Sequence, residues 1–128
     1  MERIDLVVEV LVETKRAERL WQHELPIESP TGAARARVQA TRVFARQSRN
    51  QRTSNARLSG AELQAAVRLA PTADRLLRDA VERWSFSARA VHRTLRVART
   101  ISDLAAADAI GDQSVAEALS MRHETLRQ

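Results

Sequence analysis

The stretch LSGAEL, from Leu58 to Leu63, carries the strongest local structural signal in the chain. Ser59 and Glu62 have the spacing of a capping box, in which each residue satisfies a free backbone N–H group at the start of a helix. Leu58 and Leu63 occupy the two positions of a hydrophobic staple. The stretch therefore predicts a helix that begins at Gly60, and it favours a helical fold.

The same kind of signal recurs in SFSARAV, where Ser87 is the predicted N-cap and Phe86 and Val91 form the staple. It predicts a long helix that runs to about Ala107. Between the two starts, Pro71 stands where the first turn of a helix tolerates proline. It opens a helix over residues 71–84 whose apolar face holds Ala73, Leu76, Leu77, Ala80 and Val81.

Two further helices flank these three. From Thr31 to about Gln47 small and apolar residues recur at helical spacing, and a polar, basic loop follows over residues 48–57. Gly111 and Asp112 interrupt the chain and restart it as a closing helix. The recurring residues of the two helices are Ala34, Val38, Thr41 and Ala45 in the first and Val115, Ala118 and Leu119 in the last.

Composition agrees with one helical domain. The chain has 128 residues, 44% of them hydrophobic but only 3% aromatic, so its core must consist mainly of small and branched aliphatic side chains that suit closely packed helices. It has no cysteine, which excludes disulfides and thiolate metal sites, and its three histidines are too far apart for a local metal site. No signal peptide or run of 18 apolar residues occurs, so we expect a soluble, cytoplasmic protein without a membrane partner.

The N-terminal run RIDLVVEVLV, from Arg3 to Val12, has the pattern of a buried β-strand. No second strand of similar strength follows, and a single strand is not stable alone, so we expect the chain to be part of a larger protein. The sequence thus predicts a mainly α fold: one strand and a linker over residues 1–30, then a bundle of about five helices over residues 31–128. Whether residues 1–30 are ordered stays open.

Arginines mark one face of the long predicted helix. Arg89, Arg93, Arg96 and Arg99 lie opposite its apolar residues, and only Asp103 is within reach to offset their repulsion. Arg89 also falls in the first turn, where a cation is unfavourable by about 0.3 to 1 kcal/mol and an anion such as phosphate is favoured. The alternative is a solvated face whose arginines pair with the preceding helix; on either reading, Arg96 and Arg99 are expected to be surface or interface charges.

A second basic region extends from Glu28 to Glu62, because no acidic residue lies between them. Seven arginines accumulate there, and each phosphate contact would add salt-dependent affinity for DNA. A plain solvated surface or a subunit interface is the alternative. The residues considered for DNA contact are Arg46, Arg49, Arg52 and Arg57.

Four blocks, RIDLVVEV, LSGAEL, SARAVHRTLRVARTISDLA and DQSVAEAL, together resemble the C-terminal part of the magnesium-chelatase-related AAA+ ATPases, which include the ChlI subunit and the ComM (YifB) competence proteins. The resemblance implies a helical AAA+ lid preceded by the last strand of the AAA+ core. It implies that Arg3 is an arginine finger acting on a neighbouring subunit, and that Arg89 is the sensor-2 residue that contacts ATP, with Arg93 the alternative one turn later.

The resemblance also implies a larger enzyme: a hexameric ATPase that uses ATP and Mg²⁺, held by an upstream core, to drive DNA branch migration in natural transformation. The chain itself contains no GxxxxGK[ST] phosphate loop, so we expect it to bind neither ligand unaided and to hydrolyse no ATP alone. Two alternatives to the lid remain, a stand-alone helical DNA-binding module and a helical protein-interaction domain.

Overall fold

The computed structural model describes residues 6–8 and 30–122, and these residues confirm a mainly helical fold with five α-helices and no strand. The predicted strand from Arg3 to Val12 lies outside the described residues except for residues 6–8, which form no strand. None of the described helices is long and apolar enough to cross a membrane. In chain order the elements are α2 (Pro30–Arg49), the 3₁₀-helix η1 (Asn55–Arg57), α3 (Gly60–Ala66), α4 (Pro71–Trp84), α5 (Ala88–Leu104) and α6 (Asp112–Ser120).

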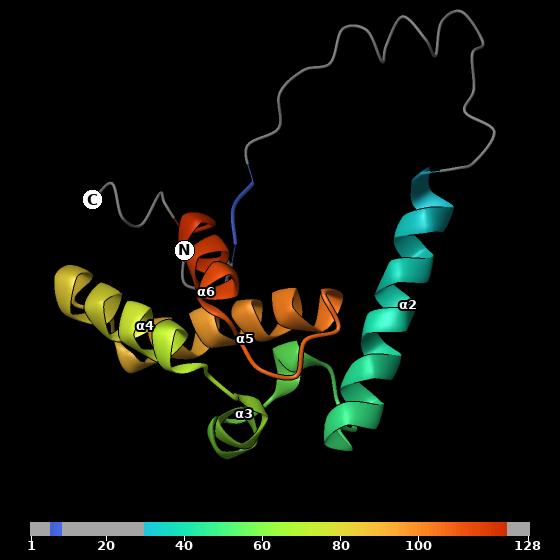
Figure 1. Cartoon of the computed structure of the whole chain (residues 1–128), viewed down its shortest axis with the longest axis horizontal. Helices are drawn as coiled ribbons and strands as arrows, with labels where there is room; N and C mark the ends of the chain where they lie inside the picture. Colours follow the sequence, from blue (N-terminus) through green and yellow to red (C-terminus); the bar gives the residue numbers. More distant parts are fainter. Residues whose placement is uncertain (1–5, 9–29, 123–128) are drawn as a thin grey trace, which may run out of the picture.

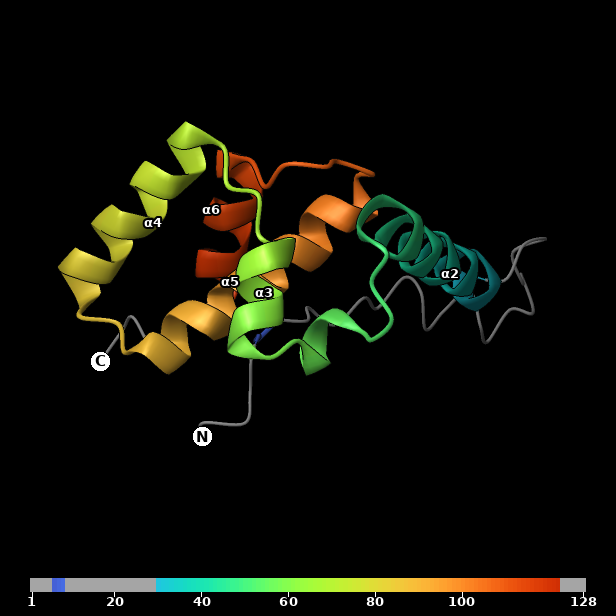
Figure 2. The same ribbon diagram turned by 90° about the horizontal axis from the view of Figure 1, so that it is seen from below.

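Helix α5 is the central element. It packs against α6, α2, α3 and η1, while α4 packs against α6. In Figure 1 it runs across the middle of the molecule, with α4 and α6 at one end and α2 at the other, and Figure 2 shows α3 crossing beneath it. Because neighbours surround α5 along its length, its polar face is not simply a surface facing water.

The main core lies where α4, α5 and α6 meet. Small side chains allow this close approach, since Ala73 of α4, Ala98 of α5 and Ala118 of α6 are all at most 1% exposed. Ile110 and Val115 are fully buried beside them. The apolar faces predicted for residues 71–84 and for the closing helix are therefore confirmed.

The predicted helix starts are confirmed at Gly60 and after Ser87. The Ser59 hydroxyl accepts a hydrogen bond from the Glu62 backbone N–H at 3.4 Å and donates one to the Glu62 carboxylate at 2.9 Å. Leu58 and Leu63, the predicted staple, are buried together in a second apolar cluster. Local capping chemistry thus decides where α3 begins.

Two loops join the halves of the bundle. The Ile110 N–H donates to the carbonyl of Arg68 at 2.7 Å, and the Ala70 N–H donates to the carbonyl of Ile110 at 2.9 Å. These bonds form a short parallel bridge between Leu69 and Ile110. The α3–α4 connection is thereby fixed to the α5–α6 connection at the end of α5.

Helix α5 ends at Leu104, three residues before the predicted end near Ala107. The cause is a reversal of the chain at Ala106, which adopts a left-handed backbone with φ of 53°. The Ala107 N–H donates to the carbonyl of Ser102 at 2.8 Å, and the Ala106 N–H donates to that of Asp103 at 2.9 Å. This pair of bonds is a Schellman motif, which usually has glycine in the position that Ala106 occupies.

Replacing Ala106 with glycine is expected to raise the free energy of unfolding by about 0.5 to 1 kcal/mol, because glycine adopts positive φ without the steric cost that alanine meets. Urea unfolding followed by circular dichroism measures the change. Ala109→Gly, in the same loop, is the control and is expected to give no gain. A loss of stability in Ala106→Gly would show that the left-handed turn is not strained.

Helix α2 stands partly away from the bundle. Residues 31–40 are all exposed, and Val38 is 44% exposed. Of the recurring residues predicted for this helix, Ala45 is buried and Thr41 is half-buried, whereas Ala34 and Val38 face solvent. The amphipathic pattern therefore correctly predicted the helix, but only its C-terminal part packs on α5 in this chain.

Candidate functional site

The start of α5 presents Arg89. Ser87 caps the helix by accepting a hydrogen bond from the Ala90 N–H at 3.1 Å, and Phe86 and Val91 pack partly buried against the main core. Arg89 follows two residues after the cap and is exposed. A cation in the first turn opposes the helix dipole, while the same turn favours an anion. The side chain and the helix end can therefore act together on a phosphate group.

The next two arginines of α5 are partly buried. Arg93 lies one turn after Arg89 and is half-buried. Arg96 is also half-buried, and its Nη2 donates to the carbonyl of Leu58 at 3.0 Å. This bond ties α5 to the residue that precedes the α3 cap, so the expectation that Arg96 is a surface or interface charge is wrong within this chain.

Arg99 is fully buried, and the prediction that it is a surface or interface charge is also wrong. Its guanidinium donates to the backbone carbonyls of Ala107 at 2.6 Å, Asp108 at 2.8 Å and Ala66 at 3.3 Å. These carbonyls lie at the end of α3 and in the loop after α5. Arg99 therefore satisfies polar backbone groups in the interior.

Asp103 is the centre of a buried polar network. Its carboxylate accepts two bonds from Arg49, at 2.6 and 2.8 Å, one from Arg99 at 3.2 Å and one from Asn55 at 2.9 Å. The Asn55 amide also donates to the Thr100 hydroxyl at 2.9 Å. The network joins α2, η1 and α5, and the paired Arg49 guanidinium has the two-pronged geometry that arginine favours with carboxylates.

The network contains more positive than negative charge. Burial is the main influence on Arg99 and lowers the pKa of its guanidinium; Asp103 acts in the opposite direction, and Arg49 lowers the pKa further. Arginine nevertheless stays protonated in proteins. The carboxylate of Asp103 therefore faces two buried cations, Arg49 and Arg99, and its loss would leave both unpaired.

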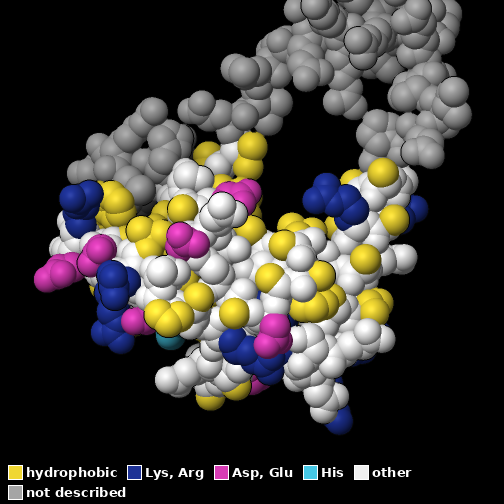
Figure 3. Space-filling model, in the orientation of Figure 1, with side chains coloured by type: hydrophobic (Ala, Val, Ile, Leu, Met, Phe, Trp, Pro, Cys, Tyr) yellow, Lys and Arg dark blue, Asp and Glu magenta, His cyan; other side chains and the backbone are white. Residues whose placement is uncertain are grey.

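The basic segment divides into exposed and buried arginines. Arg46, Arg52 and Arg57 are exposed, as the predicted DNA contact requires. Arg49 is not available to DNA, because its side chain is 4% exposed and bound to Asp103. Figure 3 shows dark blue side chains but no magenta ones on α2, and magenta side chains nearer α4 and α6.

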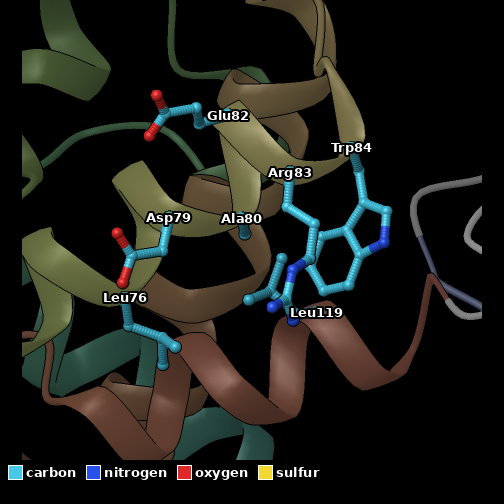
Figure 4. Close-up of a pocket in the computed structure, with 7 residues that line it drawn as sticks. All are labelled: Leu76, Asp79, Ala80, Glu82, Arg83, Trp84 and Leu119. Atoms are coloured by element: carbon cyan, nitrogen blue, oxygen red, sulfur yellow. The ribbon is translucent and has the colours of Figure 1, made fainter.

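A hollow of about 520 Å³ lies between α4 and α6. Figure 4 shows Arg83 reaching across Ala80 toward Leu119, with the Trp84 ring beside it. The Arg83 guanidinium lies 5.9 Å from the centre of that ring, and Trp84 is 40% exposed. None of the predicted site residues lines this hollow. Arg3 lies outside the described residues, and no three His, Asp or Glu side chains within them gather as metal ligands would.

Comparison with known proteins agrees with this arrangement. The family model of the C-terminal domain of magnesium chelatase subunit ChlI matches residues 28–122, which include all five described helices except for masked ends. The chain belongs to this ChlI C-terminal family. The family comprises C-terminal domains of AAA+ proteins of the magnesium chelatase and YifB type, as the sequence blocks indicated.

The uncharacterized protein YifB of Salmonella typhimurium is 36% identical to the chain over 122 residues. The match covers 95% of the chain but only 23% of YifB, so the chain spans about a quarter of that relative. No solved structure matches the chain.

The sequence gave one usable hint of the buried network. Asp103 is the only acidic residue of α5 and stands four residues after Arg99, which is the spacing of a helical ion pair. Arg49 and Asn55 carry no such signal, because they approach Asp103 from 54 and 48 residues away in the chain.

Proposed function

We propose that the chain is the C-terminal lid of a larger, ring-forming AAA+ ATPase, in which Arg89 contacts the γ-phosphate of ATP as the sensor-2 residue. The observation that carries the proposal is the exposed position of Arg89 in the capped first turn of α5. An arginine placed against the helix dipole gains little for stability there, but its charge is presented beside free N–H groups that also attract phosphate.

ATP and Mg²⁺ belong to the upstream core in this proposal, because the chain has no phosphate loop. The lid contributes positive charge that offsets the charge developing on the transferred phosphoryl group. Arg93 lies on the same side of α5 one turn later and is the second candidate for this contact. The partners are the core in the same polypeptide and the neighbouring subunits of a hexamer.

Arg3 is proposed to act in trans, as the finger that reaches ATP bound by a neighbouring subunit. A ring of Arg3→Ala subunits is expected to hydrolyse no ATP above background. Mixing these subunits in equal amounts with subunits whose phosphate loop is defective should restore about a quarter of the wild-type rate, because about one interface in four then combines an intact finger with an intact phosphate loop. Steady-state phosphate release measures the rate.

Arg75→Ala, an exposed substitution on α4, is the control and should leave the rate unchanged with or without mixing. Failure of the mixed ring to regain activity would contradict a finger acting in trans.

Branched DNA is the proposed substrate of the parent ring, which would drive branch migration during natural transformation. The exposed arginines of α2 and of the following loop support a nucleic-acid partner, since no acidic residue lies between Glu28 and Glu62. The same surface is compatible with a helical module that binds DNA without ATP. Loss of ATP hydrolysis in Arg3→Ala distinguishes the ATPase lid from that module.

A further inference from the structure

A second hollow, of about 480 Å³, lies between the C-terminal half of α2 and the loop that leads to η1. We call it the arginine hollow, because Arg42 and Arg46 of α2 and Arg52 of the loop line it. All three side chains are exposed. The hollow lies at the end of α2 that packs on α5, where the chain turns toward η1 (Figure 1).

The three arginines of the hollow form no hydrogen bond or ion pair with any of residues 6–8 and 30–122. Asp103 is the one acidic residue among those that line the hollow, and it is 2% exposed and already bound by Arg49 and Arg99. Arg42 and Arg46, four residues apart on a helix, repel each other by a few tenths of a kcal/mol. The hollow therefore holds positive charge that an anion would offset.

The loop that carries Arg52 is held in place from both sides. The Gln51 amide donates to the Thr53 carbonyl at 2.7 Å and to the Asn55 side-chain oxygen at 2.8 Å. Asn55 in turn donates to the buried Asp103. The backbone on either side of Arg52 is thus tied to α5, which lowers the conformational entropy lost when Arg52 binds a ligand.

We propose that the arginine hollow binds phosphate groups of a nucleic-acid backbone. Arginine is suited to phosphate because its planar group donates two parallel hydrogen bonds to it. No aromatic side chain lines the hollow, so bases have nothing to stack on and the binding should not depend on sequence. The inference deepens the DNA part of the proposed function, on which it rests, and it uses neither Arg3 nor Arg89.

The salt dependence of DNA binding tests the hollow. A labelled duplex of random sequence is titrated with the 128-residue chain at several salt concentrations from about 50 to about 200 mM, and log K is plotted against log salt. Replacing Arg42, Arg46 and Arg52 together with glutamine should make the slope shallower by about two to three, because each lost phosphate contact removes about 0.7 to 0.9. Arg52→Gln alone should remove about one.

The matched control is the triple replacement of Arg75, Arg78 and Arg83 with glutamine, which removes the same net charge from exposed positions on α4. It should leave the slope within about 0.5 of the wild-type value if DNA binds at the hollow. Equal changes in the two triple variants would overturn the proposal, because DNA would then respond only to net charge. Absence of DNA binding by the wild-type chain at low salt would also overturn it.

Free nucleotides carry the same phosphate chemistry, so ATP is titrated in parallel. Binding of ATP that is lost in the hollow variants, without binding of DNA, would assign the hollow to a nucleotide and overturn a nucleic-acid ligand. The melting temperature of each variant should stay within about 4 °C of wild type, because all the altered side chains are exposed; if the α2 replacements unfold the chain, Arg52→Gln still provides the test. Failure here leaves ATP hydrolysis through Arg89 untouched, so the two proposals fail separately.

Discussion

Replacing Asp103 with alanine is expected to lower the free energy of unfolding by about 3 to 5 kcal/mol. The carboxylate is 2% exposed and accepts hydrogen bonds from two buried arginines and from Asn55. Its removal leaves Arg49 and Arg99 as uncompensated charges in the interior, and neither can lose its proton to escape the cost. It also frees the end of α2 and the η1 loop from α5.

Urea unfolding followed by circular dichroism measures this loss. Asp74→Ala is the control, because Asp74 pairs with Arg78 on the surface of α4 and should cost at most about 0.5 kcal/mol. If Asp103→Ala is unfolded without urea, Asp103→Asn, which keeps one acceptor oxygen, should unfold between alanine and wild type. A loss below about 1 kcal/mol for Asp103→Ala would mean that the network does not hold the bundle together.

Replacing Arg89 with alanine should lower kcat for ATP hydrolysis by the parent ring about a thousandfold, because arginines that contact the transferred phosphoryl group contribute effects of that order. The fold should be unaffected, since Arg89 is exposed and lies where a cation is electrostatically unfavourable. The 128-residue chain carrying Arg89→Ala should therefore melt at or slightly above the wild-type temperature.

Steady-state kinetics of the parent ring and thermal melting of the chain are the two measurements. Arg93→Ala is the comparison that decides between neighbouring turns of α5, and a larger loss of kcat there would move the assignment to Arg93. Loss of helical content in Arg89→Ala would instead make Arg89 a structural residue.

The elements that the sequence predicted well are those decided by neighbouring residues. Ser59 and Ser87 cap their helices through hydrogen bonds that span three residues, and Pro71 opens α4 through its own backbone geometry. Such interactions are complete within one turn of chain. Their outcome therefore depends little on the rest of the fold.

Arg99 and Asp103 were misjudged because a helical wheel separates polar from apolar residues but does not say what covers the polar side. In the structure α2, η1 and α3 cover that side of α5, so the polar residues of its C-terminal half are buried and must pair. The partners Arg49 and Asn55 come from another part of the chain, and only the tertiary fold brings them to Asp103.

The measurement that tests the proposed role of Arg89 most directly is a single-turnover assay of γ-phosphate cleavage by the parent ring at saturating ATP. It separates the chemical step from nucleotide binding and product release. With Arg89→Ala, cleavage should slow about a thousandfold while ATP is still bound. An unchanged cleavage rate in that variant, with ATP bound, would contradict a sensor-2 role for Arg89 and with it the proposed function of the chain as an AAA+ lid.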